Sequence, residues 1–142
     1  MSIWKKEIDL KRLNAMSKDT IIALLGIEYT HIGGDFIQGN MPVDSRTHQP
    51  HGLLHGGASV VFSETLGSVA ANLAAPEGKV CVGLEVNANH IRSIKKGIVI
   101  GTATAVHIGH STQVWQIEIC NEREQLICTS RLTVAVIDKP KQ

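Results

Sequence analysis

The residues best suited to chemistry are gathered in one run, Gln49-Pro50-His51-Gly52-Leu53-Leu54-His55-Gly56-Gly57. The run ends where a long helix of small residues is expected to begin, so free backbone N–H groups and the positive end of the helix dipole meet there. Glycines let a ligand approach the backbone, and such an end can stabilise the oxyanion that forms when a carbonyl is attacked. Alone this is weak evidence, because glycine at a helix start and histidine in a turn are common.

A single carboxylate, Glu64, stands in the middle of the same expected helix among small and apolar residues. Burying a carboxylate costs free energy unless it has partners or a task, so Glu64 is a candidate catalytic group. Ser68 follows four residues later, and both side chains face the same way. The structural alternative is a glutamate on a solvated stripe, which the scarcity of charges on this helix disfavours.

The spacing of these groups has a consequence for assembly. Eight residues separate Gly56 from Glu64, which is about 12 Å along a helix axis at about 1.5 Å per residue. One small reacting group cannot touch both. If both act on one carbonyl, the glutamate comes from a second chain whose helix runs antiparallel, and the site lies across a two-fold interface. The spacing therefore predicts an obligate dimer at minimum.

Periodicity defines the elements that must position these groups. The helix is expected from about Gly56 to Ala75, stopped by Pro76 and Gly78. Two short helices capped by Asp9 and Thr20 are expected to form a packing lid. Strands are expected over residues 27–32, 36–43, 80–91, 97–108, 112–120 and 126–137, the first two joined by a Gly33-Gly34-Asp35 turn.

These elements predict one α+β domain covering residues 1–142, in which a curved antiparallel sheet wraps a single long central helix. The first two strands form a hairpin, and short turns such as the one at residues 121–124 indicate that the later strands form a meander. Neither a repeat nor a domain linker is evident.

Composition excludes several classes of protein. Lys and Arg (14) nearly balance Asp and Glu (13), and no basic run exceeds a pair, so nucleic acid is not expected as a partner. Cys81, Cys120 and Cys128 lack C-x-x-C spacing and are expected to be buried free thiols. Without a signal-peptide core or a membrane-length apolar stretch, we expect a soluble, cytoplasmic protein that binds no membrane.

Three stretches, QPHGLLHGGASVVFSETLGS, VGLEVNANHIRS and GHSTQVWQIEI, resemble the hotdog-fold thioesterases that cleave 1,4-dihydroxy-2-naphthoyl-CoA and related aroyl-CoA compounds. The resemblance covers nearly the whole chain, and HGG followed eight residues later by Glu is characteristic of that branch. It implies hydrolysis of an aroyl- or acyl-CoA thioester, a role in menaquinone biosynthesis, no metal, and no cofactor beyond the coenzyme A of the substrate. It also implies a homotetramer built as a dimer of dimers.

The resemblance also implies roles for individual residues. Glu64 would be the nucleophile or general base, Gly56 and Gln49 would polarise the thioester carbonyl, His55 would assist the leaving thiolate, and Ser68 would orient the water or the Glu64 carboxylate. Substrate contacts are expected from the following residues: His51, Val82, Gly83, His90, Arg92, Ser93, Gly109, His110 and Ser111. His51 stands where close relatives usually carry Phe, which changes the polarity of the acyl pocket.

Several alternatives stay open at this point. His48, His51 and His55 in one loop invite a metal site, but their spacing matches no familiar ligand pattern. A Cys–His nucleophile is disfavoured because the cysteines lie on strand segments. The protein could also be a non-catalytic acyl-CoA binding module, a hotdog hydratase or dehydratase, or a proofreading enzyme for mischarged aryl carrier proteins.

Overall fold

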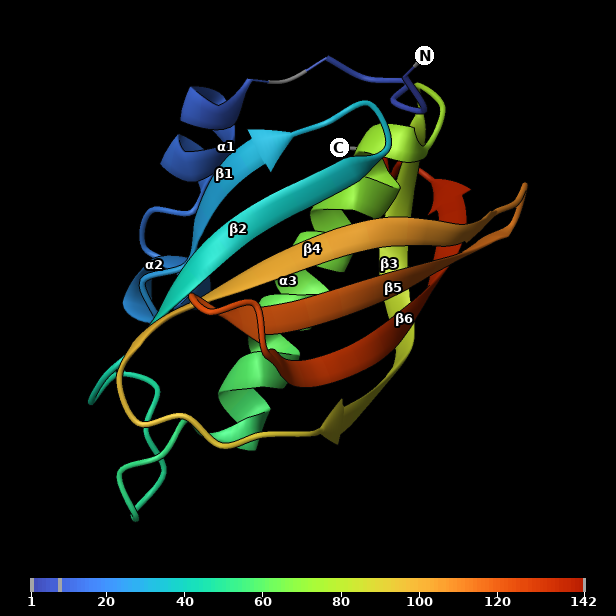
Figure 1. Ribbon diagram of the computed structural model, residues 1–142. Coiled ribbons are helices and arrows are strands. Elements are labelled where there is room, and N and C mark those ends of the chain that lie inside the picture. The colour runs from blue at the N-terminus through green and yellow to red at the C-terminus, as the bar shows by residue number, and fades with distance from the viewer. Residues whose placement is uncertain (1, 8, 142) are drawn as a thin grey trace.

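A curved antiparallel sheet wraps one long helix in the computed structural model, which describes residues 2–7 and 9–141 (Figure 1). The chain order is α1 (Leu10–Met16), α2 (Ile21–Leu24), β1 (Glu28–Ile32), β2 (Phe36–Val43), α3 (Gly56–Ala74), β3 (Lys79–His90), β4 (Gly97–Ile108), β5 (Thr112–Asn121) and β6 (Leu126–Asp138). The predicted α+β architecture is confirmed. Every expected strand is present, with ends that differ by at most one residue from the prediction.

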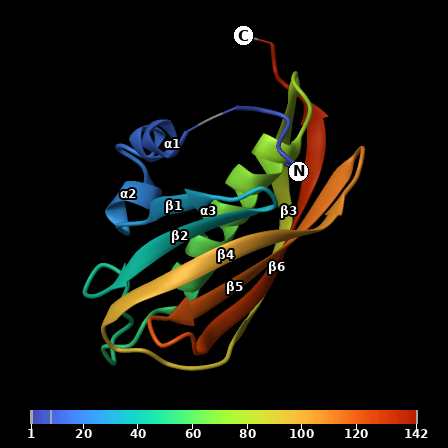
Figure 2. The same ribbon diagram turned by 45° about the horizontal axis from the view of Figure 1, so that its top comes forward.

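The order of strands in the sheet is β1-β2-β4-β5-β6-β3, and this corrects the predicted meander. Strands β4, β5 and β6 follow one another as expected, but β3 pairs with β6 and lies at the far edge. The reason is geometric: α3 crosses the inner face of the sheet, so the chain leaves the helix beside β6. Residues 91–96 then carry it back past the start of the helix to β4 (Figures 1 and 2).

Helix α3 is held in the core by alternating apolar residues of the surrounding strands. Phe62, Leu66 and Ala70 are fully buried on the helix, and Trp115, Ile117 and Ile119 are fully buried on β5. The alternation predicted for β5 is therefore confirmed. Gly101 and Gly67 let the layers approach closely, since a Cβ at Gly101 would come within 2.6 Å of Leu66.

The two short N-terminal helices begin at the predicted caps. The Asp9 side chain accepts a hydrogen bond from the Arg12 N–H at 2.7 Å, and the Thr20 hydroxyl accepts one from Ile22 N–H. Only Leu13 of the expected lid is buried, whereas Met16 is 66% exposed. Leu10, Ile22 and Leu25 are partly buried against the core, so the lid prediction is confirmed for these residues and for Leu13 and is wrong for Met16.

Candidate active site

The first turn of α3 leaves one backbone N–H group without an acceptor. His55 is the N-cap, and its Nδ1 accepts a hydrogen bond from Gly57 N–H at 2.8 Å. The N–H groups of Ala58 and Ser59 both donate to the His55 carbonyl. No residue in the described ranges accepts a bond from Gly56 N–H. The helix therefore presents the Gly56 N–H, with the positive end of its dipole, to an incoming oxygen.

The cap also fixes the tautomer of His55. Because Nδ1 accepts a hydrogen bond, the proton of the neutral ring is on Nε2. The His55 side chain is exposed and does not line the cavity described below. Its Nε2–H is thus available to a ligand that approaches the helix from solvent.

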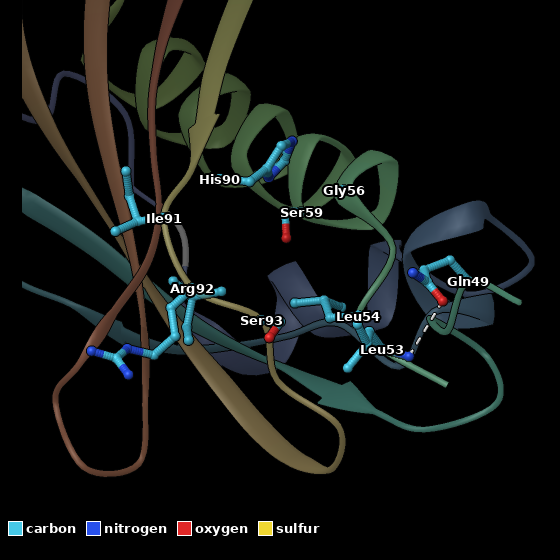
Figure 3. Close-up of a pocket in the computed structure, with 10 residues that line it drawn as sticks. Gln49, Leu53, Leu54, Gly56, Ser59, His90, Ile91, Arg92 and Ser93 are labelled. Carbon is cyan, nitrogen blue, oxygen red and sulfur yellow. Dashed lines mark hydrogen bonds between the residues drawn. The ribbon is translucent and has the colours of Figure 1, made fainter. Parts of the chain in front are cut away.

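Gln49 is held by the loop that precedes the helix. Its Oε1 accepts from the backbone N–H groups of His51 and Leu53, the second at 3.5 Å (Figure 3). Its own N–H donates to the Leu53 carbonyl at 2.8 Å, and Gly52, with φ +75°, closes the turn. Since the oxygen is used by the loop, the amide Nε2 is the end left to donate to a ligand.

A cavity of about 390 Å³ opens beside the helix start (Figure 3). Its walls come from the loop before α3, the first turn of α3, the end of β3 and the start of β6: Gln49, Leu53, Leu54, Gly56, Ser59, His90, Ile91, Arg92, Ser93 and Ile127. Five predicted residues therefore meet here: Gln49, Gly56, His90, Arg92 and Ser93. The His90 ring lies against Gly56, because a Cβ at Gly56 would be 2.8 Å from His90 Nε2.

Two details of this cavity differ from the sequence-based expectation. The hydroxyl of Ser59 points into the cavity, although the sequence analysis did not select it; its position three residues after Gly56 was the available signal. The guanidinium of Arg92 points away from Ser59 and Gly56 (Figure 3). His51 does not line the cavity, and its side chain is exposed.

Glu64 and Ser68 lie further along α3, away from this cavity. Glu64 is half-buried, and no residue among those described forms a salt bridge or a hydrogen bond with its carboxylate. The carboxylate faces β3, since a Cβ at Gly83 would be 2.6 Å from Glu64 Oε2. Ser68 is also half-buried, one turn after Glu64 on the same side of the helix. One chain thus keeps the carboxylate apart from Gly56, as the spacing predicted.

The other expected substrate contacts are also remote from the cavity. Gly109, His110 and Ser111 form the tip of the β4–β5 hairpin, which projects beyond the sheet (Figures 1 and 2). The Ser111 carbonyl accepts a bond from Val136 N–H, whereas the cavity touches β6 at Ile127, near its other end. Val82 is 44% exposed on the edge strand. A single chain does not bring these residues together with the cavity.

The three thiols are free, and burial raises the pKa of Cys81, Cys120 and Cys128. Thiols with a raised pKa stay protonated near neutral pH and are poor nucleophiles. Only Cys128 is fully buried, so the predicted burial is wrong for the two half-buried thiols. Within residues 2–7 and 9–141, His, Cys, Asp and Glu form no group that could hold a metal, and no helix could span a membrane.

Residues 51–128 match the model of the thioesterase superfamily, and the chain belongs to this family. It is 52% identical to the 1,4-dihydroxy-2-naphthoyl-CoA hydrolase of Escherichia coli, covering 95% of this chain and 99% of that protein. It is 48% identical to the proofreading thioesterase EntH of Cronobacter turicensis, covering 95% and 98%. The family resemblance found in the sequence is therefore confirmed.

Solved structures agree with this assignment. Thioesterase HI1161 of Haemophilus influenzae superposes with a TM-score of 0.96 at 46% identity, covering 99% of this chain and 98% of that one. A variant of SAV0944 of Staphylococcus aureus superposes with a TM-score of 0.79 at 41% identity, covering 84% and 99%. The fold is the hotdog fold, and the protein is a thioester hydrolase.

Proposed function

We propose that the protein hydrolyses an aroyl- or acyl-CoA thioester to the free acid and coenzyme A, with 1,4-dihydroxy-2-naphthoyl-CoA as its substrate. The observation that carries the proposal is the unpaired Gly56 N–H beside the Gln49 amide, whose oxygen is already bound to the loop. Both residues line the cavity, and two N–H donors that contact one carbonyl oxygen stabilise the oxyanion of a thioester under attack. The relative from E. coli carries the name of this hydrolase at 52% identity, which supports the choice of substrate.

Glu64 supplies the negative charge that the reaction needs. As a general base it takes a proton from water, and the hydroxide adds to the carbonyl carbon and expels the coenzyme A thiolate. As a nucleophile its carboxylate oxygen attacks the carbonyl carbon, the C–S bond breaks and the coenzyme A thiolate leaves, and water hydrolyses the resulting acyl–glutamyl anhydride to the free acid and the Glu64 carboxylate. Ser68, one turn away, orients the water or the carboxylate, and the Nε2–H of His55 donates to the leaving sulfur.

Variants of the related SAV0944 support the choice of groups. One structure of that protein replaces a glutamine and another replaces a glutamate fifteen residues later. Gln49 and Glu64 have the same spacing in this chain. The pair is therefore the natural target for substitution here as well.

The free edge of β3 supports the assembly that the proposed mechanism requires. β3 is a 12-residue strand that, within residues 2–7 and 9–141, pairs with β6 on one side only. Val82 and Leu84 on it are 44% and 60% exposed. A long edge with apolar side chains is a template for pairing with another chain. Antiparallel pairing of two copies places the Gly83 end of one β3 beside the His90 end of the other. Because Glu64 lies at Gly83 and Gly56 lies at His90, Glu64 of one subunit then approaches Gly56 of the other.

Within this proposal the tip of the β4–β5 hairpin binds the nucleotide of coenzyme A. The same two-fold pairing places residues 109–111 of one subunit near the cavity of its partner. The nucleotide part of bound coenzyme A extends out of the cavity at this point. Gly109, His110 and Ser111 then contact the nucleotide together with His90, Arg92 and Ser93. Pairing of two such dimers gives the proposed tetramer.

Steady-state hydrolysis of 1,4-dihydroxy-2-naphthoyl-CoA, benzoyl-CoA and a medium-chain acyl-CoA, followed by release of free thiol, tests the proposal. Wild-type protein is expected to prefer an aroyl thioester, and Glu64→Gln, which keeps the shape of the side chain, is expected to lose several orders of magnitude in kcat. Binding of all three compounds without turnover would replace the hydrolase by a binding module.

A second candidate is proofreading of aryl carrier proteins, which is favoured by the 48% identity to a proofreading thioesterase. The two candidates share the chemistry and differ in what carries the thiol. Comparing kcat/KM for one aroyl group on coenzyme A and on a carrier protein separates them. A higher value for the carrier protein selects proofreading. The variant His51→Phe, assayed with aroyl and alkyl thioesters, tests whether His51 sets the acyl preference; unchanged ratios would exclude it.

A further inference from the structure

The Glu64 carboxylate occupies the space that a side chain at Gly83 on β3 would fill. A Cβ added at Gly83 would lie 2.6 Å from Glu64 Oε2 and 3.8 Å from Glu64 Cδ, and it would meet no other heavy atom of the described residues within 4 Å. Gly83 does not have a positive φ. Its backbone conformation therefore does not require glycine. Among the described residues, only the Glu64 carboxylate would clash with a side chain at this position.

A hydrogen bond joins the helix to the strand about two turns beyond this contact along α3. Asn72 is four residues after Ser68 and eight after Glu64, so all three share one side of α3. Asn72 Oδ1 accepts a hydrogen bond from Cys81 N–H at 2.9 Å, and its Nδ2 donates to the Ser68 carbonyl at 2.8 Å. Asn72 thus bridges α3 and β3 two residues before Gly83.

We propose that Gly83 is a positioning residue, which leaves room for the Glu64 carboxylate, and that Asn72 holds α3 and β3 in the register that keeps this fit. The sequence resemblance had implied that Gly83 contacts the substrate; the geometry gives it a role toward the carboxylate instead. This inference rests on the proposed catalytic role of Glu64.

The size of the displacement follows from the contact distance. Ordinary van der Waals contacts of a Cβ begin at 3.4 Å, so a methyl group at position 83 moves Oε2 by about 0.8 Å from its present 2.6 Å separation to reach such a contact. The carboxylate is the end of a flexible side chain and can swing away at little cost in stability. A misplacement of about 1 Å in a catalytic group can lower a rate by about 100-fold. Gly83→Ala is therefore expected to lower kcat by roughly 10- to 100-fold, with KM nearly unchanged.

Gly101→Ala is a matched control on β4. Its Cβ would also come within 2.6 Å of a neighbour, but that neighbour is Leu66 in the core, with Phe62 at 2.9 Å. Gly101→Ala is expected to lower the melting temperature, whereas Gly83→Ala is expected to leave it unchanged or slightly raised. An equal loss of melting temperature in both variants would overturn the inference, because Gly83 would then be a packing residue.

Two further pairs of variants give readouts that a general structural role would not change. In a Glu64→Asp background the carboxylate is one carbon shorter, so adding Gly83→Ala is expected to lower kcat less than it does in wild type. Asn72→Asp keeps the acceptor for Cys81 N–H and is expected to retain more activity than Asn72→Ala. Additive losses in the first pair, or equal losses in the second, would contradict the inference.

A crystal structure of the Gly83→Ala protein tests the geometry without any assay of activity. We expect Glu64 Oε2 to be displaced by about 0.8 Å with β3 in place. A fixed carboxylate with a shifted strand would overturn the inference even if the protein hydrolyses thioesters. A displaced carboxylate in a protein that hydrolyses none of the thioesters above would confirm the fit and refute the proposed function.

Discussion

Replacing the N-cap histidine separates its structural contribution from its chemical one. His55→Ala removes the Nδ1 acceptor of Gly57 N–H, while His55→Asn supplies a side chain that caps helices well. Loss of an N-cap costs about 1 kcal/mol of stability. An unfolding entropy of about 2.1 cal/mol/K per residue, over 142 residues, gives about 0.3 kcal/mol/K. The alanine variant is therefore expected to melt about 3 °C lower, and the asparagine variant close to wild type.

The kinetic effect of the two variants is expected to differ from the thermal one. Both lose the Nε2–H that is proposed to donate to the leaving sulfur, so both are expected to lower kcat to a similar degree. Differential scanning calorimetry and thiol release measure the two effects on the same samples. If His55→Asn melts as low as His55→Ala, the cap described for α3 does not stabilise the protein and the reasoning is refuted.

Three further predictions concern other parts of the molecule. Burial raises the pKa of Tyr29 to about 12 from 10.0. The neutral phenol therefore contributes roughly 3 kcal/mol to the free energy of unfolding, which is complete below pH 10 and is lost as the pH rises toward 12. Tyr29 is the only tyrosine, so ultraviolet titration of the phenol reports it directly, and ionisation near pH 10 would contradict this. Leu84→Asp on the free β3 edge is expected to shift the protein toward monomers in sedimentation, and an unchanged mass would exclude this edge as the interface. Phe62→Ala, at a fully buried position, is expected to cost about 3–5 kcal/mol in denaturant unfolding. A loss below about 1 kcal/mol would contradict the packing described.

Local signals in the sequence predicted most of the elements. Burial alternates with a period of two along β2 and β5 and along parts of β4 and β6. The start and end of α3 are marked by Gly56 and Pro76. The place of β3 could not be predicted in this way, because its pairing with β6 joins segments that are far apart in the sequence. The periodicity of a strand predicts which of its faces is buried, but it does not predict which strand lies beside it.

In the candidate site too, residues close in sequence were predictable, whereas contacts between distant segments were not. Gln49, His55 and Gly56 are close in sequence, so their shared place at the helix start was predictable from the run itself. The role of Gly83 depends on a contact between β3 and α3 that only the packed structure shows. Asn72 carried a signal, since it shares the helix side of Glu64 and Ser68, but its partner Cys81 was not identifiable before the fold was known.

The central claim is that Gln49 and Gly56 of one subunit act with Glu64 of another, and subunit mixing tests it most directly. Two inactive proteins, Gln49→Ala and Glu64→Gln, are unfolded together in equal amounts, refolded and assayed for thioester hydrolysis. If the site is shared, half of the dimers are mixed and each has one intact site, so activity returns to about one quarter of wild type. If both groups act within one chain, no mixed dimer has an intact site, and activity that stays at the level of the parent variants would contradict the account.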